Sequence, residues 1–135
     1  MAAATTDRNT RARNGHEYSF PVKAGEVIPA GVIVALKGSV ALNGAADVDQ
    51  VIVGMSTDPA DNSAGGDGDI RVNITRQGLR RFGNSASTDA ITLMQIGTPC
   101  YVVDNQTVAK TSSTGTRPVA GTVMDVDADG VWIKF

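Results

Sequence analysis

Residues 31–42 read GVIVALKGSVAL, two short apolar runs separated by Lys37-Gly38. β-Branched side chains suit the surface of a pleated sheet, and a two-residue link between such runs is typical of a β-hairpin. Short apolar runs bounded by turn residues continue on both sides of this stretch, so strands are expected along most of the chain. The further strands expected are QVIVGM (50–55), IRVNITR (70–76), LRRF (79–82), PCYVV (99–103), TVA (107–109), VAGTVM (119–124) and VWIKF (131–135).

Strands this close together, with no long helical pattern between them, predict an all-β fold, a small antiparallel β-sandwich or barrel. Residues 84–96 are ambiguous, because polar residues there could cap a short helix and an irregular strand fits nearly as well. The strand phases predict a core, since successive side chains of a strand face opposite ways. The expected core residues are Val32, Val34, Val53, Ile70, Val72, Val102, Val123 and Trp132.

An internal repeat indicates two similar units. One copy begins at Gly31 with GVIVAL and the other at Gly97 with GTPCYVV, and each continues through a turn, a Val-Ala pair, a polar loop and an apolar strand with an internal glycine. A turn rich in Asp and Gly and one more strand follow each copy. The repeat therefore predicts two three-strand units, which either pack face to face or close one barrel.

Residues 1–15 differ from the rest of the chain. The segment is small and polar, lacks apolar periodicity, and carries Arg8, Arg11 and Arg13 against Asp7 alone. Such a segment buries too little apolar surface to offset the entropy lost on ordering it. We therefore expect a flexible N-terminal arm over 1–15, used for docking, and a single β-rich domain over 16–135. A disordered solubilising tail is the alternative for the arm.

The composition argues against several classes of function. With 135 residues, a formal net charge of −2 and a pI of about 5.2, the chain has the size of one domain and no overall charge suited to nucleic acid. It has no apolar stretch long enough for a membrane helix, and its first residues lack the apolar core of a signal peptide. We therefore expect a soluble protein, made in the cytoplasm, without direct nucleic-acid or membrane partners.

The acidic run Asp125-Val126-Asp127-Ala128-Asp129-Gly130 resembles the opening of an EF-hand calcium loop. No helical pattern flanks it, however, and the position of the closing Glu falls beyond Phe135. A solvated hairpin turn is therefore favoured, and no metal site is expected.

Nor does a residue pattern predict catalysis or a cofactor site. Cys100, the only cysteine, lies in an apolar run and is expected to be a small buried hydrophobe. Its one potential base is His16, the single histidine, which lies far away in sequence. The chain is predicted not to be an enzyme.

A second basic group, Arg76, Arg80 and Arg81, flanks the turn Gln77-Gly78. One interpretation is a solvated hairpin whose charges keep an edge strand from aggregating. The other is a secondary patch that docks on an acidic partner.

Four stretches together resemble a known family. They are AGEVIPAGVIVAL (24–36), VIVGMSTD (51–58), IGTPCYVVDNQTVAK (96–110) and AGTVMDVDADGVWIKF (120–135). They are similar to the small capsid decoration, or cement, proteins of tailed bacteriophages. The arm lies outside the resemblance.

The resemblance implies a β-rich structural protein of the virion that binds the outer surface of an assembled head and stabilises it against internal pressure. Its partner would be the major capsid protein, which many members contact through an N-terminal arm, and it carries no catalytic residues. Some members are trimers, so a homotrimer is expected. The alternative is a non-catalytic module that binds a ligand such as carbohydrate, for which Tyr18, Tyr101 and Trp132 are the candidate aromatic platforms.

Overall fold

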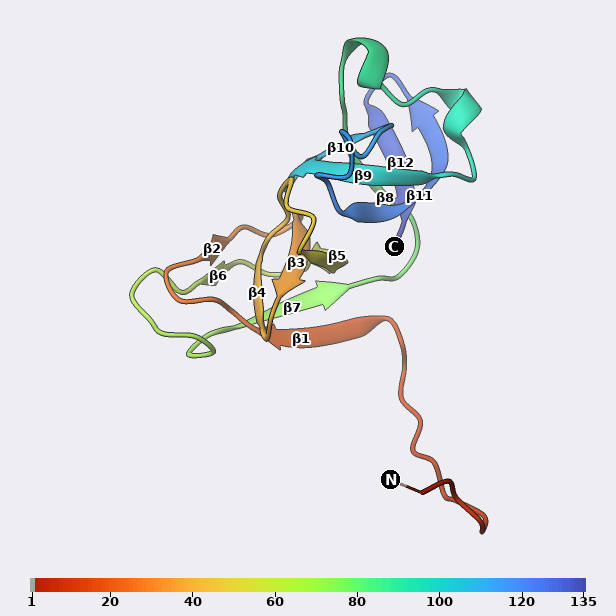
Figure 1. Ribbon diagram of the computed structural model, residues 1–135. Coiled ribbons are helices and arrows are strands. Elements are labelled where there is room, and N and C mark those ends of the chain that lie inside the picture. The colour runs from red at the N-terminus through yellow and green to blue at the C-terminus, as the bar shows by residue number, and fades with distance from the viewer. Residues whose placement is uncertain (1) are drawn as a thin grey trace.

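The computed structural model, which describes residues 2–135, consists mainly of β-strands (Figure 1). Within the described residues, five strands of the N-terminal half form one sheet, two more pair as a separate two-stranded sheet, and the strands of the C-terminal half close into a five-stranded barrel. The N-terminal strands are β1 (Glu17–Pro21), β2 (Val27–Ile28), β3 (Ile33–Lys37), β4 (Val40–Asn43), β5 (Val51–Ser56), β6 (Ala60–Asp61) and β7 (Arg71–Thr75). The C-terminal strands are β8 (Arg80–Asn84), β9 (Pro99–Asp104), β10 (Thr107–Ala109), β11 (Val119–Asp127) and β12 (Gly130–Lys134). The all-β prediction is confirmed.

We call the sheet β1-β7-β5-β3-β4 the first unit and the barrel formed by β8 to β12 the second unit. Read from β8, the barrel has the order β8-β12-β11-β9-β10, which matches the first unit strand for strand. In each unit a parallel contact leads from the last strand back to the first. In the second unit it is the β10–β8 ladder, and in the first it is the single bridge between Val22, just after β1, and Ala41 of β4.

Individual residue pairs support the same match. Val34 pairs with Gly54 in the first unit, and Cys100 pairs with Gly121 in the second. At both glycines an added Cβ would collide with a backbone oxygen of the next strand, β7 or β12. The predicted repeat is therefore present. The expected number of strands is wrong, because each unit has five and not three. The two units also do not close one barrel, because each curls around its own core.

The β3–β4 hairpin is present, with its turn one residue later than expected. Lys37 pairs with Val40, so the turn residues are Gly38 and Ser39. Gly38 has a φ of 64°, which suits the first position of a type II′ turn, where Gly is favoured because it has no Cβ.

Two apolar cores follow from the two units. The first contains Val22, Ile28, Val34, Ala41, Val53, Ala60, Val72 and Ile74. The second contains Phe82, Ile91, Cys100, Val102, Val108, Ala120, Val123, Val131 and Ile133, together with Ile33 from the first unit. Ile33 thus joins the units, because it belongs to β3 by sequence and to the second core by packing.

Most of the expected core is buried, namely Val34, Val53, Val72, Val102 and Val123. The prediction for Ile70 is wrong: it is 39% exposed, because β7 begins only at Arg71 and Ile70 lies outside the strand alternation. Val32 and Trp132 are only partly buried. Trp132 lies on the outer face of β12, since its neighbours in the strand occupy the inner face.

Residues 84–96 form neither a regular short helix nor an irregular strand. After β8 they contain two 3₁₀ turns, Ser87–Asp89 and Leu93–Gln95. In the second turn, Thr92 N donates to Gln95 Oε1 at 2.7 Å and Met94 N donates to Thr92 Oγ1 at 3.3 Å. This capping box fixes one turn, whereas a stable α-helix needs several consecutive turns.

The edge strand β1 has a protected outer edge. Val22 N donates to Ile70 O on the β7 side, so the alternate backbone groups, those of Ser19 and Pro21, point outward. Pro21 has no N–H to offer. The Arg71 guanidinium crosses β1 and donates to Ser19 O at 2.8 Å and to Ser19 Oγ at 3.0 Å. An incoming strand therefore finds few free partners on this edge.

Candidate functional site

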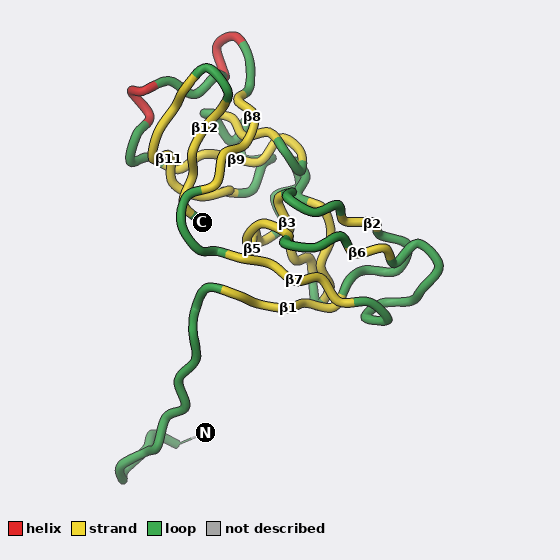
Figure 2. The backbone as a smooth tube through the Cα atoms, turned by 180° about the vertical axis from the view of Figure 1, so that it is seen from behind, coloured by secondary structure: helices red, strands yellow, loops and turns green. Residues whose placement is uncertain are grey.

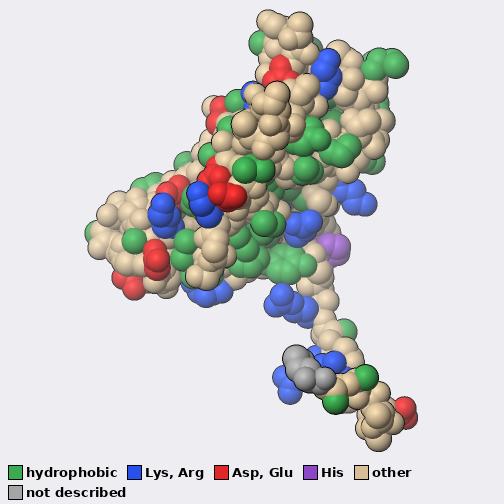
Figure 3. Space-filling view, in the orientation of Figure 1, with side chains coloured by type: hydrophobic (Ala, Val, Ile, Leu, Met, Phe, Trp, Pro, Cys, Tyr) green, Lys and Arg blue, Asp and Glu red, His purple; other side chains and the backbone are tan. Residues whose placement is uncertain are grey.

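The N-terminal arm extends away from both units (Figure 2). Residues 2–14 form no helix or strand, and all of their side chains are exposed, those of Arg8 and Arg11 included. In the space-filling view, Lys and Arg side chains line the arm and gather around the place where it leaves the body (Figure 3). The arm can therefore contact a surface that the body does not touch.

The root of the arm is fixed by Tyr18 of β1. The Arg13 guanidinium lies 5.3 Å from the centroid of the Tyr18 ring, a cation–π contact. Tyr18 Oη donates a hydrogen bond to Gly15 O at 3.0 Å. The Tyr18 ring also stacks on that of Phe20, with centroids 6.2 Å apart. Of the three predicted docking arginines, Arg13 is thus held against the body, whereas Arg8 and Arg11 are farther along the projecting arm.

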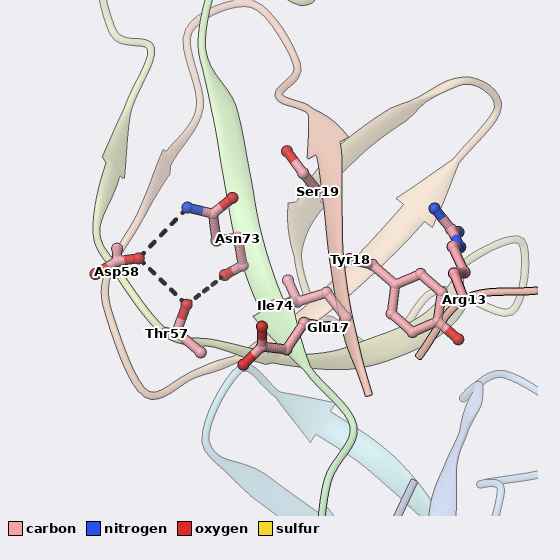
Figure 4. A pocket seen from close by; sticks show the side chains of 8 residues that line it. All are labelled: Arg13, Glu17, Tyr18, Ser19, Thr57, Asp58, Asn73 and Ile74. Carbon is pink, nitrogen blue, oxygen red and sulfur yellow. Dashed lines mark hydrogen bonds between the residues drawn. The ribbon is translucent and has the colours of Figure 1, made fainter. Parts of the chain in front are cut away.

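A groove with a volume of about 550 Å³ lies beside this root (Figure 4). Its lining residues are Arg13, Glu17, Tyr18, Ser19, Thr57, Asp58, Asn73 and Ile74. β1 and β7 form the floor, and the segment after β5 forms one wall, as the close-up shows.

Hydrogen bonds hold the polar wall of the groove in place. Thr57 Oγ1 lies 3.3 Å from Asp58 Oδ2 and donates to Asn73 O at 3.2 Å. Asn73 Nδ2 lies 3.5 Å from the same carboxylate oxygen. The groove thus offers carboxylate and amide groups at one end and an aromatic ring with a guanidinium at the other. Such groups are suited to binding a polar chain, and the lining holds neither the cysteine nor the histidine that nucleophilic catalysis often uses.

A second hollow, of about 320 Å³, is also lined by Tyr18. It is lined by Tyr18, Phe20, Val53 and Arg76, and we call these residues the open end of the first unit. Arg76 Nη1 donates to Val53 O at 2.9 Å. The lining is mostly apolar and carries one cation.

The three arginines of the predicted secondary patch do not lie together. Arg76 belongs to the open end, whereas Arg80 and Arg81 belong to β8 of the second unit. Arg81 lies 5.7 Å from the centroid of the Trp132 ring and 3.6 Å from Asp129 Oδ2, so a carboxylate partly neutralises it. Arg80 is partly buried, and its Nε has no hydrogen-bond partner within residues 2–135. Arg76 alone therefore lies beside the arm root.

The acidic run at 125–130 belongs to the β11–β12 hairpin, as predicted, although only Ala128 and Asp129 form the turn, because β11 extends to Asp127. Asp127 Oδ1 accepts hydrogen bonds from Asp129 N at 2.8 Å and Gly130 N at 3.1 Å, and its Oδ2 accepts one from Trp132 Nε1 at 2.8 Å. The bond from Trp132 is the main cause that lowers the pKa of Asp127 below its usual value. No group of three or more metal-ligating side chains comes together in residues 2–135.

The two lone candidates for catalysis lie in different units. Cys100 is buried in the second core, as predicted, and burial raises the pKa of its thiol to about 11. His16 is exposed next to β1 of the first unit. A thiol with a raised pKa and no adjacent base is a poor nucleophile at neutral pH.

Sequence reasoning missed an ion pair that joins two loops of the second unit. Arg117 Nη1 lies 2.6 Å from Asp89 Oδ2, and Thr111 Oγ1 donates to Asp89 Oδ1 at 2.7 Å. Asp89 is 28 residues from Arg117. Because neither residue lies in a periodic segment, no signal in the sequence pairs them.

Comparison with protein-family models, with curated proteins and with solved structures finds no match to this chain. Among residues 2–135, no helix has the length and apolar character needed to cross a membrane.

Proposed function

We propose that this chain is a non-catalytic capsid decoration protein of a tailed bacteriophage, which binds the outer surface of the assembled head and stabilises it. The observation that carries the proposal is the geometry of residues 2–14, a basic and exposed arm that leaves a β-rich body with its own cores. The family resemblance of residues 24–135 supplies the class of partner, the major capsid protein.

The charge distribution supports docking by the arm. Residues 1–15 hold three of the 12 basic residues and one of the 14 acidic residues, so the arm is basic and the body is acidic. An arm that becomes ordered on contact loses roughly 1–2 kcal/mol of backbone entropy per residue. Charge-assisted hydrogen bonds from Arg8, Arg11 and Arg13 to carboxylates or carbonyls of the shell offset that loss.

The experiment compares attachment to purified heads that lack the protein. Deleting residues 1–15 should leave the melting temperature nearly unchanged and weaken attachment strongly. Replacing Arg8, Arg11 and Arg13 together by Gln should have a similar, smaller effect. The matched control replaces three lysines of the body by Gln, at Lys23, Lys110 and Lys134, and should attach almost normally.

Added salt should imitate the arginine substitutions in part, because exposed charges are screened. The docking proposal fails if the truncated protein attaches as tightly as the full chain. It also fails if truncation unfolds the body, since the arm would then belong to the fold.

The second candidate is a module that binds carbohydrate or another polar ligand, and the groove beside Tyr18 favours it. A ring with carboxylate and amide neighbours is typical of a sugar subsite. Of the other aromatic candidates, Trp132 is less available, because Arg81 covers its ring and Asp127 binds its N–H. Titration of labelled protein with oligosaccharides should shift amide signals around Asn73 if this candidate holds, and should leave them unchanged under the leading proposal.

A further inference from the structure

The match between the two units shows which residue of the second unit takes the place of each residue of the first. The pairings align Tyr18 with Arg80 and Phe20 with Phe82, because these residues lie opposite equivalent positions of β7 and β12. Val53 directly precedes Gly54, and Ala120 directly precedes the equivalent Gly121. Arg76 follows the last residue of β7, and Phe135 follows the last residue of the equivalent strand β12. The four residues of the open end therefore have four counterparts in the second unit.

In the second unit, the counterparts of the open end are covered. The Phe135 ring packs edge to face on Phe82, with centroids 5.9 Å apart. The first unit adds Ile33, which is fully buried in the second core, and Ile52 and Met55, which pack against the same core. Phe135 thus covers Phe82, and side chains of β3 and β5 from the first unit pack against the core of the barrel.

In the first unit the same end is a hollow. Arg76 takes the place of Phe135, and its guanidinium bonds to the backbone of Val53 rather than covering an aromatic ring. Tyr18 and Phe20 remain only partly buried and line about 320 Å³ of space. Within residues 2–135, no other segment lines this hollow.

The second unit carries the counterpart of the covering surface. In the first unit that surface contains Ile33, Ile52 and Met55, and in the β3–β5 ladder Ile33 pairs with Met55 and Ile52 pairs with Ala35. The equivalent pairs in the second unit are Pro99–Thr122 and Tyr101–Val119. Of these, Pro99 is exposed and Val119 is 52% exposed, so both side chains are available to a partner. We call Pro99, Val119 and Thr122 the outer face of the second unit.

We propose that the open end of the first unit binds the outer face of the second unit of another copy of this chain. The contact would repeat, between molecules, the contact that already joins the two units within one molecule. Both surfaces lie on every copy, so the contact is head to tail and builds a closed ring or a filament, depending on the rotation between copies. The contact does not depend on the capsid proposal, because it needs only the chain itself.

One feature of the internal contact has no counterpart. Ile33 N donates to Asn105 O at 2.8 Å, whereas the equivalent Pro99 has no N–H. The contact between copies therefore rests on apolar side chains, with Arg76 as the charged group at its edge. A charge placed on Val119 should act on it directly.

The test measures self-association of the purified full chain by sedimentation equilibrium. The wild type should show an average mass that rises above the 14.0 kDa monomer with concentration. Val119→Arg should weaken the association constant by about tenfold or more, because it sets a second cation against Arg76 in an apolar contact. The matched control is Val27→Arg, since Val27 is 49% exposed in strand β2 and lies outside both surfaces, and it should associate as the wild type does.

A charge exchange tests the pairing itself. Arg76→Glu alone should weaken association, and the double variant Val119→Arg with Arg76→Glu should recover most of it. Melting temperatures show whether each variant is folded. The proposal is overturned if the wild type stays monomeric up to millimolar concentration, if Val27→Arg weakens association as much as Val119→Arg, or if the double variant shows no recovery.

Discussion

In the first unit, one isolated bridge connects β4 to Val22, the residue after β1. In the second unit, the β10–β8 ladder closes the barrel. The strand order is the same in both, so the sheet itself does not decide how far a unit closes. The difference lies at one end, where the second unit has Phe135 and the first has Arg76. One strand arrangement can therefore produce a covered core in one unit and an uncovered hollow in the other.

The comparison of the two units also predicts a different role for each. The second unit, which we call the closed unit, contains the buried thiol of Cys100, the Asp89–Arg117 ion pair and the aromatic contact between Phe82 and Phe135. The first unit, which we call the open unit, carries the arm, the groove and the hollow beside Tyr18. We expect the closed unit to resist perturbation and the open unit to make the external contacts, and the predictions below test that division.

The largest expected effect concerns the matched glycines. Gly54→Ala and Gly121→Ala should each lower the free energy of unfolding by about 3 kcal/mol, because a Cβ would meet Thr75 O or Lys134 O. Gly66→Ala is the control, since its nearest neighbour would be Asp69 Oδ2 at 3.7 Å, and it should change stability little. Urea unfolding measures all three. A small effect at one matched glycine alone would break the equivalence of the two units.

A thiol reagent should distinguish the closed unit from the unfolded chain. Burial raises the pKa of Cys100 from 9.0 to about 11, so at pH 8 the thiolate population falls by about 100-fold, before any effect of limited access. Modification of the native protein should thus be at least about 100-fold slower than in urea. A native rate within tenfold of the unfolded rate would show that the second barrel opens readily.

The two ends should differ in their contribution to stability. Phe135→Ala should cost about 2 kcal/mol, because it removes the ring that covers Phe82, whereas Arg76→Ala should cost well under about 1 kcal/mol. Both values come from denaturant unfolding of the purified chain. Equal losses would mean that the open end is already part of a sealed core, contrary to the comparison.

A modest effect is expected for the loop ion pair Asp89–Arg117, whose contribution to stability depends on pH. The pKa of Asp89 is lowered, mainly by its hydrogen bond from Arg117, so the ionised form stabilises the fold. That contribution is present above the unfolded pKa, near 4, and is lost as the pH falls through the lowered pKa of the folded state. Asp89→Asn should cost about 1 kcal/mol at pH 7, and its unfolding curve should approach that of the wild type in acid.

The exposed pair Lys37–Asp47 is the matched comparison in the first unit. Asp47→Asn should leave the melting temperature at pH 7 almost unchanged, since exposed ion pairs contribute little. If the losses for Asp89→Asn and Asp47→Asn were equal, the two units would not differ in how firmly their loops are held.

The sequence predicts the strands well, because runs such as GVIVAL combine β-branched residues with glycine-bounded ends. It also predicts the repeat. Side-chain direction is less predictable, since alternation places Ile33 away from the first core but does not show that the second core receives it. Bulges add to this uncertainty, because the β3–β5 register shifts between Val34 and Ala35.

The candidate site is less predictable still. The arm and its arginines follow from composition alone. The open end does not, because Arg76 and Phe135 become equivalent only when β7 and β12 are aligned through their pairings. The groove likewise combines residues from three separate segments, and no single stretch of sequence brings Tyr18, Asp58 and Asn73 together.

The guarded edge of β1 has a consequence for crowded conditions. An incompletely closed sheet would ordinarily recruit strands from neighbouring molecules and seed fibrous aggregates. Here the guanidinium of Arg71 occupies the outward carbonyl of Ser19, and the proline that follows supplies no amide hydrogen. The chain can therefore leave one unit unsealed and still resist such aggregation at high local density, because this edge offers neighbouring molecules few backbone partners.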